Sequence, residues 1–402
     1  MNNRKHTTPL DRLAALSRKR ERLVAGLMSG TSVNAVDCAI CSISGHGIPA
    51  PGNPGAKVEL LGFTSVPFPA ALRARVTDQA QLNARAIAEL NQEVGELFGL
   101  ACLKALKSAG LKTSALDLIG SHGQTIYHHS GIKGHRVATL QIGDGDIIAE
   151  RLGVPVVSDF RPRDIACGGE GAPLTPYADA VLFARHYAKV GIINIGGISN
   201  LTLLNKDKRL IVGFDLGPGN APLDRLTRIV SKGRAAFDSD GKLARGAKID
   251  LNLLKSLIRA DKFIKRKPPK STGTEMYGDL FVQRAIKEYG RANKDLLATM
   301  TAFVGYAIAY GISHHIKRSQ LPDIVYVAGG GCRNQFLMEL LEGLLDPLVV
   351  AVSDDFGIPA EAREALSFAI LANDLVCGEQ TSIKTVTGAR HDARLGKISL
   401  GA

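Results

Sequence analysis

The chain has 402 residues, of which 45% are hydrophobic, 22% are charged and 43 are glycine. This composition excludes a disordered chain and is typical of a globular α/β protein with many tight turns. Because a single hydrophobic core rarely grows beyond about 250 to 300 residues, we expect two domains. Much of the net charge of +12 lies near the N-terminus, and no recognition helix or zinc finger accompanies it, so no nucleic-acid partner is expected.

Residues 1–22 form a basic arm that we expect to be flexible and solvated. The arm lacks the apolar core and cleavage site of a secretory signal. Apolar runs of the roughly 18 to 20 residues that span a bilayer are not found, so we expect a cytoplasmic protein without membrane contact. The six cysteines fit a reducing cytosol, and Cys38 and Cys41, which have the spacing of a metal or redox pair, are expected to be ordinary packing residues.

In the first half of the chain, hydrophobic patterns predict four strands and one long helix. The strands are expected at 23–27, 36–43, 116–119 and 154–157, and the helix at 83–108. A turn of small residues at 28–32 joins the first two strands into a hairpin. We expect Gly110 to cap the helix, and Ser121-His122-Gly123-Gln124-Thr125 to end the third strand as a loop.

The second half of the chain repeats this hairpin-and-helix arrangement after about 160 residues, as a duplicated fold would. Strands are expected at 190–195, 200–204, 210–216 and 324–328, and helices at 221–230 and 334–344. The repeat predicts an α/β fold of two similar lobes around a ligand cleft. We place the boundary between Ser158 and Asp159, which gives lobes of residues 23–158 and 159–402.

Glycine-rich turns follow four of the predicted strands. Small residues let backbone amides approach phosphate oxygens, and ligands of open α/β sheets collect at the carboxyl ends of strands. We expect phosphates to bind at Gly30-Thr31-Ser32 and at Gly196-Gly197, and adenosine to bind at Gly329, Gly330 and Gly331. Neither a Walker A sequence nor a Gly-x-Gly-x-x-Gly fingerprint occurs, which argues against P-loop and Rossmann folds.

Charged residues crowd the segment after the strand at 154–157. Phosphoryl transfer needs positioning, a metal ion and one proton acceptor, and a carboxylate at a strand end suits the last task. We assign that task to Asp159, with Asp37 and Asp215 as further candidates, and expect Arg161 and Arg163 to hold an anionic group.

Three alternative interpretations of charged or polar residues stay open. Asp159 and Asp164 could pair with the two arginines at the surface. His122 could bind substrate or cap a strand. Glu361 and Glu364 are expected to be solvated or to join the lobes rather than to catalyse.

A series of short motifs, in order over about residues 23–396, resembles that of the anhydro-N-acetylmuramic acid kinase family. The motifs are Gly26-Leu27-Met28-Ser29-Gly30-Thr31-Ser32, Ser121-His122-Gly123-Gln124-Thr125, Gln141-Ile142-Gly143-Asp144, Asp159-Phe160-Arg161, Gly171-Ala172-Pro173-Leu174, Asn194-Ile195-Gly196-Gly197, Phe214-Asp215, Gly217-Pro218-Gly219-Asn220, Lys270-Ser271-Thr272-Gly273, Gly329-Gly330-Gly331 and Val386-Thr387-Gly388-Ala389.

The resemblance implies two actin-like (RNase H-like) lobes and a kinase of cell-wall recycling that uses ATP and Mg²⁺. Its substrate would be 1,6-anhydro-N-acetylmuramic acid, converted with water to N-acetylmuramic acid 6-phosphate. The resemblance extends the phosphate loop over Gly30, Thr31, Ser32, Val33, Asn34, Ala35, Val36 and Asp37, and places the catalytic aspartate on Asp159. The substrate-binding residues it implies are His122, Gln124, Arg161, Arg163, Gly171, Asp215 and Asn220.

The chain departs from the family pattern at four positions, of which Asn34, in place of an aspartate, bears most on magnesium. The milder departures are Glu170 for glutamine, Leu216 for a small residue and Thr274 for arginine. Two alternatives therefore stay open: a non-catalytic protein that binds nucleotide and sugar, and an ATPase indifferent to sugar. A homodimer is possible, and the magnesium ligands are not assigned.

Overall fold

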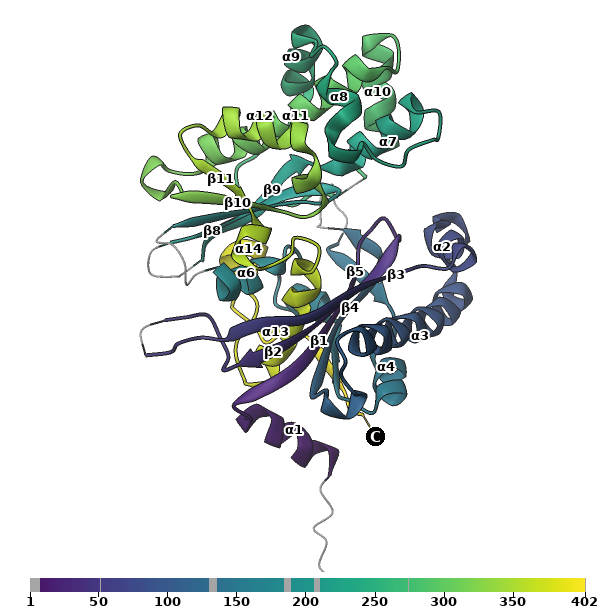
Figure 1. Ribbon diagram of the computed structural model, residues 1–402, viewed down its shortest axis with the longest axis vertical. Coiled ribbons are helices and arrows are strands. Elements are labelled where there is room, and N and C mark those ends of the chain that lie inside the picture. The colour runs from purple at the N-terminus through teal and green to yellow at the C-terminus, as the bar shows by residue number, and fades with distance from the viewer. Residues whose placement is uncertain are drawn as a thin grey trace, which may run out of the picture. The chain divides into compact units, whose positions relative to one another are not determined.

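The computed structural model describes residues 8–50, 52–129, 136–183, 189–205, 210–273 and 275–401. It contains two compact units, one of Met1–Arg185 with Ala362–Ala402 and one of His186–Glu361 (Figure 1). This division differs from the boundary expected after Ser158. The chain returns to the first unit at its end because β12 (Lys397–Ser399) pairs antiparallel with β6 (Val156–Ser158).

The first unit is built on a mixed sheet with the strand order β3-β2-β1-β4-β6-β12, and β5 pairs with β4 at one side. Its remaining strands are β1 (Glu21–Ser29), β2 (Ala35–Ser44), β3 (Lys57–Pro67), β4 (Leu118–His129) and β5 (Ala138–Ile142). β1, β2 and β3 form an antiparallel meander, whereas β4 runs parallel to both β1 and β6.

The second unit repeats this order in its sheet, β9-β8-β7-β10-β11. The strands are β7 (Val190–Ile195), β8 (Ile198–Leu204), β9 (Leu210–Pro218), β10 (Ile324–Ala328) and β11 (Val349–Val352). Again the first three strands form an antiparallel meander and the last two join it in parallel. Each unit thus has a three-two-one-four-five sheet, which confirms the predicted α/β fold of two actin-like lobes.

Helices cover both faces of the first sheet. They are α1 (Pro9–Arg18), α2 (Ala70–Thr77), α3 (Ala84–Ser108), α4 (Gly145–Leu152), α5 (Phe160–Ala166), α6 (Thr175–Phe183), α13 (Arg363–Val376) and α14 (Lys384–Thr387). On β1, Ala25 and Leu27 share a hydrophobic core with α3, whereas Gly26 meets the backbone of α13. Since neighbouring residues of a strand face opposite sides, α3 and α13 lie on opposite faces of the sheet.

Two glycines let α13 lie directly on the sheet. Gly26 and Gly120 are paired residues of β1 and β4. A Cβ atom would stand 1.9 Å from the carbonyl oxygen of Ala365 at the first position and 2.0 Å from that of Phe368 at the second. The helix backbone therefore occupies the space that side chains would need at these two positions.

The second unit has its helices around α11, an apolar helix whose inner positions are almost all buried. The helices are α7 (Asn220–Val230), α8 (Lys242–Arg245), α9 (Leu251–Ala260), α10 (Asp279–Tyr289), α11 (Lys294–His315) and α12 (Gln335–Leu345). By length and composition α11 could cross a membrane, but 83% of its most apolar 18-residue stretch is buried inside the unit. The expectation that the chain has no apolar run of this length is therefore wrong, since Gly305 and Gly311 lie inside the helix and do not interrupt it.

Several element predictions are confirmed. β7 and β10 have the predicted bounds, and α3 begins directly after Asn83, whose side-chain oxygen accepts a hydrogen bond from the Ala86 amide at 3.0 Å. Gly110 adopts the left-handed conformation, φ 70°, that ends many helices. Cys38 and Cys41 are buried free thiols, as expected of packing residues.

The expectation that residues 121–125 form a loop is wrong. They belong to β4, which continues to His129 because β5 pairs with it from Gln124 onward. Gly123 lies within the strand with φ 74°, a value that favours glycine. The apolar run at 116–119 predicted only the start of this strand. The second half of β4 is not apolar and is held by pairing with β5, which follows it in the sequence.

The end of the basic arm is ordered. Thr8 and Asp11 form a capping box at the start of α1, and the Lys19 ammonium pairs with Asp117 at 2.6 Å. Arg22 is buried, donating to Asn373 Oδ1 at 2.6 Å, to Gly45 O at 2.7 Å and to the carbonyls of Leu16 and Lys19. The expected flexibility therefore does not apply to residues 9–18, and residues 1–7 lie outside the described residues.

Removal of residues 1–19 tests what the arm does. We expect a chain that begins at Arg20 to keep its activity, because α1 contributes none of the motif residues. It should lose about 1 to 3 kcal/mol of stability, since the buried Arg22 guanidinium loses two carbonyl acceptors. Denaturation followed by circular dichroism and a turnover assay would check both parts, and a large loss of activity in a folded truncated chain would contradict this view.

Candidate functional site

The first predicted phosphate loop is an exposed hairpin tip between β1 and β2. Thr31, Ser32 and Asn34 are exposed, whereas Val33 is buried and has φ 51°, a strained value for a β-branched residue. The Ser29 hydroxyl fixes the base of the hairpin, since it lies 2.9 Å from Ala35 O and 2.7 Å from Gln124 Oε1. Strain held by such contacts is a feature of ligand-binding loops, which agrees with the predicted role.

Asp37 and Glu364 place two carboxylates beside this hairpin. Asp37 is half-buried in β2, and Glu364 lies in the first turn of α13. Burial raises the pKa of Asp37, and the negative charge of Glu364 raises it further, while a hydrogen bond from Ser65 lowers it. A divalent cation would relieve the repulsion between the two carboxylates.

Three of the predicted substrate residues meet in the first unit. Arg161 Nε donates to His122 Nε2 at 2.9 Å, and its Nη1 donates to Gly171 O at 2.8 Å. The proton of His122 must then lie on Nδ1, which donates to Gly123 O at 2.9 Å. Burial lowers the pKa of His122 well below its usual value and Arg161 lowers it further, so the ring is neutral. His122 and Gly171 therefore orient the half-buried guanidinium of Arg161.

Two other predicted substrate residues lie apart from this cluster. Gln124 is fully buried, and its side-chain amide contacts the Ser29 hydroxyl and donates to Thr125 O at 3.0 Å, so it supports the hairpin, and its substrate-binding role stays a prediction. Arg163 is exposed, on the same helix as Arg161. Of the two arginines predicted to hold an anionic group, only Arg161 therefore belongs to the cluster with His122 and Gly171.

Asp164 is not the surface ion-pair residue that one interpretation allowed. It is fully buried, and it accepts hydrogen bonds from Thr387 Oγ1 and from the Gly171 amide, both at 2.8 Å. Burial raises the pKa of its carboxyl group, which these two bonds and Arg161 partly offset. Asp164 ties the loop of Gly171 to the C-terminal segment, a contact that sequence spacing did not reveal.

Asp159 lies at the end of β6 with φ 53°, a strained left-handed value. Its Oδ2 is 3.2 Å from the Lys397 ammonium, and its side chain is 36% exposed. The strain agrees with a functional position, but a base here would have to give up an ion pair. The predicted catalytic role of Asp159 stays a prediction.

In the second unit, the glycine turns predicted to bind nucleotide meet one another. Asn220 at the start of α7 binds the β7–β8 tip through its amide, 2.7 Å from Gly196 O, and through Nδ2, 3.2 Å from Ile195 O. The Ala221 amide donates to Gly197 O at 3.2 Å. The tip of one hairpin and the first turn of α7 are therefore joined by backbone hydrogen bonds.

The triplet Gly329–Gly331 adjoins the same tip. A Cβ at Gly329, which has φ 79°, would stand 2.6 Å from Asn194 Oδ1, and a Cβ at Gly331 would stand 2.3 Å from the Ile195 side chain. Gly330 lies near Asn220 Nδ2, at 3.5 Å from its would-be Cβ. The predicted phosphate and adenosine turns of the second unit are thus neighbours, as their placement after parallel strands requires.

Asp215 lies near the end of β9 and is almost buried, with 8% exposure. The Thr272 amide donates to its Oδ2 at 2.8 Å, and its own amide donates to Lys270 O at 3.1 Å. This carboxylate is therefore held by the segment 270–272. Lys270 belongs to one of the family motifs, and the burial of its ammonium is a feature that the sequence did not predict.

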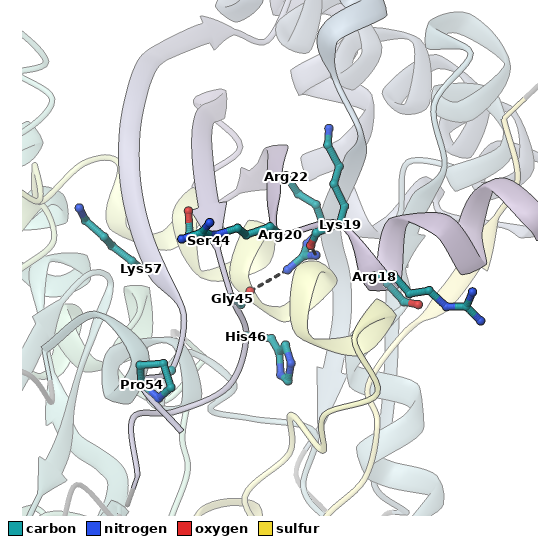
Figure 2. A pocket seen from close by; sticks show the side chains of 11 residues that line it. Arg18, Lys19, Arg20, Arg22, Ser44, Gly45, His46, Pro54 and Lys57 are labelled. Carbon is teal, nitrogen blue, oxygen red and sulfur yellow. Dashed lines mark hydrogen bonds between the residues drawn. The ribbon is translucent and has the colours of Figure 1, made fainter. Parts of the chain in front are cut away.

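A cavity of about 450 Å³ lies elsewhere in the first unit, beside the end of α1 (Figure 2). Basic side chains line much of it. Three of these have partners: Lys19 pairs with Asp117, His46 with Glu379 at 2.8 Å, and Arg22 donates to Gly45 O. None of the predicted site residues lines this cavity.

Comparison with known proteins gives matches over nearly the whole length of the chain. A family model described as anhydro-N-acetylmuramic acid kinase matches residues 22–401. The chain belongs to this family. A relative of that name from Caldanaerobacter subterraneus subsp. tengcongensis is 40% identical over 97% of this chain and 100% of its own length. One from Salinibacter ruber is 36% identical over 97% of this chain and 99% of its own.

A distant match among solved structures is the activator of the 2-hydroxyisocaproyl-CoA dehydratase from Clostridium difficile with bound ADPNP. It is 12% identical, covers 91% of this chain and 99% of its own, and has a TM-score of 0.39. The family match, unlike this distant likeness, includes every motif on which the resemblance rested. The predicted membership in the anhydro-N-acetylmuramic acid kinase family is therefore confirmed.

Proposed function

We propose that the chain phosphorylates 1,6-anhydro-N-acetylmuramic acid with ATP, opening the anhydro ring and giving N-acetylmuramic acid 6-phosphate and ADP in the cytoplasm. The observation that carries the proposal is the family match over residues 22–401. The glycine turns around Gly196, Asn220 and Gly329 and the hairpin Gly30–Asp37 supply the close backbone approach that phosphates need. Arg161 supplies a positive charge for the carboxylate of the sugar.

The substrate sets the chemistry that the residues must perform. A 1,6-anhydro sugar has no free 6-hydroxyl group, so the bond between C1 and O6 must break before O6 can accept phosphate. A water attacks C1, a carboxylate takes a proton from that water, and O6 leaves C1 with the bonding electrons. O6 then attacks the γ-phosphate and ADP departs, so one base serves ring opening and phosphoryl transfer together.

Asp215 meets the requirements of this base better than Asp159. A general base must hold one orientation, and the Thr272 amide fixes one oxygen of Asp215 within a buried setting. Asp159 is more exposed and is paired with Lys397. We therefore propose Asp215 as the base, and Asp159 as a residue that shapes the turn between β6 and α5.

A magnesium ion fits the carboxylate pair of the first unit. Mg²⁺ commonly takes one or two carboxylates together with substrate phosphates, and Asp37 and Glu364 provide such a pair beside the hairpin. When bound, the ion would screen the charge of the phosphates. Asn34 at the exposed tip adds an amide oxygen instead of a carboxylate.

The proposed function is tested by ADP release with and without the anhydro sugar. We expect stoichiometric release that depends on the sugar, and product formed in heavy-oxygen water should carry the label at C1 and none in the phosphate. Label in the phosphate, or ADP release that is indifferent to the sugar, would identify an ATPase. Binding of ATP and sugar without turnover would identify a non-catalytic binding protein.

Asn34→Asp is a further test of the magnesium assignment. The substitution restores a negative charge at the tip of the hairpin, so we expect the magnesium concentration that gives half-maximal activity to fall about threefold to tenfold, the scale of one added charge interaction. Asn293→Asp, at the half-buried N-cap of α11 in the second unit, is the charge-matched control. An unchanged magnesium requirement would show that the tip does not approach the ion.

A further inference from the structure

Lys270 is a buried cation in the loop between α9 and α10. It is 2% exposed, and its Nζ donates to Phe263 O at 3.2 Å and Ile264 O at 3.1 Å. The same atom lies 4.7 Å from the centre of the Phe263 ring and 5.6 Å from that of Phe214. Carbonyl oxygens and ring faces stabilise an ammonium group, yet burying any charge carries a free-energy cost.

The backbone of Lys270 connects this cation to the proposed base. Lys270 O accepts the Asp215 amide at 3.1 Å, and two residues later the Thr272 amide donates to Asp215 Oδ2 at 2.8 Å. The segment 270–272 therefore grips Asp215 at the main chain and at the carboxylate. The Lys270 side chain anchors that segment to Phe263 and Ile264 from the other side.

The surroundings of the ammonium contain few other charges. Burial lowers the pKa of Lys270 to about 8, while Asp215 and Asp261 act in the opposite direction and Arg266 reinforces the lowering. Asp261 is itself held by the Tyr277 hydroxyl at 2.9 Å and by the Phe263 amide at 2.8 Å. On α11, His315 lies 3.0 Å from Ile264 O, and burial lowers its pKa, so it is neutral when Lys270 titrates.

We propose that Lys270 is a positioning residue for Asp215: its side chain anchors the segment that grips the carboxylate, and its positive charge keeps that carboxylate in the anionic form that a base requires. The inference rests on the proposed role of Asp215. Electrostatic attraction between the two groups is reciprocal, so the anion that favours the ammonium is favoured by it equally.

The experiment compares Lys270→Met, which keeps an unbranched side chain one atom shorter and without its charge, with Lys270→Arg, which keeps a charge that does not titrate below about pH 12. Lys255→Met, at an exposed position of α9, is the control. For the methionine variant we expect kcat to fall about tenfold or more, the scale of a slightly misplaced group. On the acid side of its profile of kcat against pH, the midpoint of the rise should move up by about half a pH unit or more.

The alkaline limb separates a positioning charge from simple packing. In the unchanged protein kcat should fall as Lys270 loses its proton above about pH 8, because a neutral amine donates weaker hydrogen bonds to Phe263 O and Ile264 O and then holds the segment 270–272 less firmly. Lys270→Arg should lack this fall and keep the original acid limb. Because the folded-state pKa of Lys270 lies below its unfolded value, this group makes the fold more stable as pH rises from about 8 to about 10.5, so unfolding through this lysine does not account for the fall.

A direct titration keeps this inference separate from the proposed function. The infrared C=O stretching band of protonated Asp215 can be assigned by its absence in Asp215→Asn. As the pH is lowered, this band should appear at a higher pH in folded Lys270→Met than in the unchanged protein. An unmoved band, or an alkaline limb that persists in Lys270→Arg, would overturn the role of Lys270. If the band moves but Asp215→Asn keeps its turnover, the coupling stands and Asp215 is not the base.

Discussion

Asp215→Asn should lower turnover by about 100-fold or more while leaving the binding of ATP and sugar near normal. Asparagine keeps the shape of the side chain and an oxygen that can accept the Thr272 amide, whose bond to Oδ2 is 2.8 Å in the present structure. It cannot take a proton from water, and loss of a general base commonly costs about 10² to 10⁴ in rate. Single-turnover kinetics and calorimetric binding would measure the two parts separately.

Two further variants give this experiment its contrast. Asp279→Asn removes an exposed carboxylate of the same unit, one that pairs with Arg225 at 2.5 Å, and should leave turnover within about twofold. Asp159→Asn removes the partner of Lys397, and we expect a loss of no more than about tenfold from the altered turn after β6. A loss of about 100-fold in Asp159→Asn together with near-normal turnover in Asp215→Asn would reverse the assignment of the base.

Local sequence patterns predicted much of the fold where an element depends on its own residues. β7 and β10 are mainly apolar runs followed by a glycine turn, so their ends could be read directly. The start of α3 followed from Asn83, whose cap is a local hydrogen bond. The glycine turns of the second unit were expected to meet because parallel strands end at the same edge, and Gly196, Asn220 and Gly329 do meet.

Contacts between distant parts of the chain could not be predicted in this way. The extension of β4 depends on β5, and the membership of the C-terminal segment in the first unit depends on the packing of α13 against the sheet and on the pairing of β12 with β6. The same holds for polar groups in the site: Asp164 and Thr387 are 223 positions apart, and Asp215 meets Thr272 across 57 positions. Spacing in the sequence carries no signal for such pairs, so charged residues expected at the surface proved to be buried.

The close packing of α13 on the first sheet leads to the largest expected change in stability. In Gly120→Val the new Cβ would stand 2.0 Å from Phe368 O and 2.9 Å from the Ala372 Cβ, and the neighbouring Gly26 already lies against Ala365 O. Neither the helix backbone nor the central strand β4 can yield without separating α13 from the sheet. We expect a loss of about 3 kcal/mol or more, at the upper end for overpacked cores.

Gly343→Ala provides the matched comparison, because this glycine lies inside α12 and a Cβ there would meet nothing within 4 Å. Alanine favours a helix over glycine by about 0.8 to 1.0 kcal/mol, so this variant should be more stable than the unchanged protein. Since the chain has no tryptophan, denaturant unfolding should be followed by circular dichroism, and the two units could unfold separately. The Gly120 change should then shift the transition of the first unit, and the Gly343 change that of the second. A Gly120→Val protein as stable as the unchanged one would mean that α13 does not lie against Gly120 as closely as described.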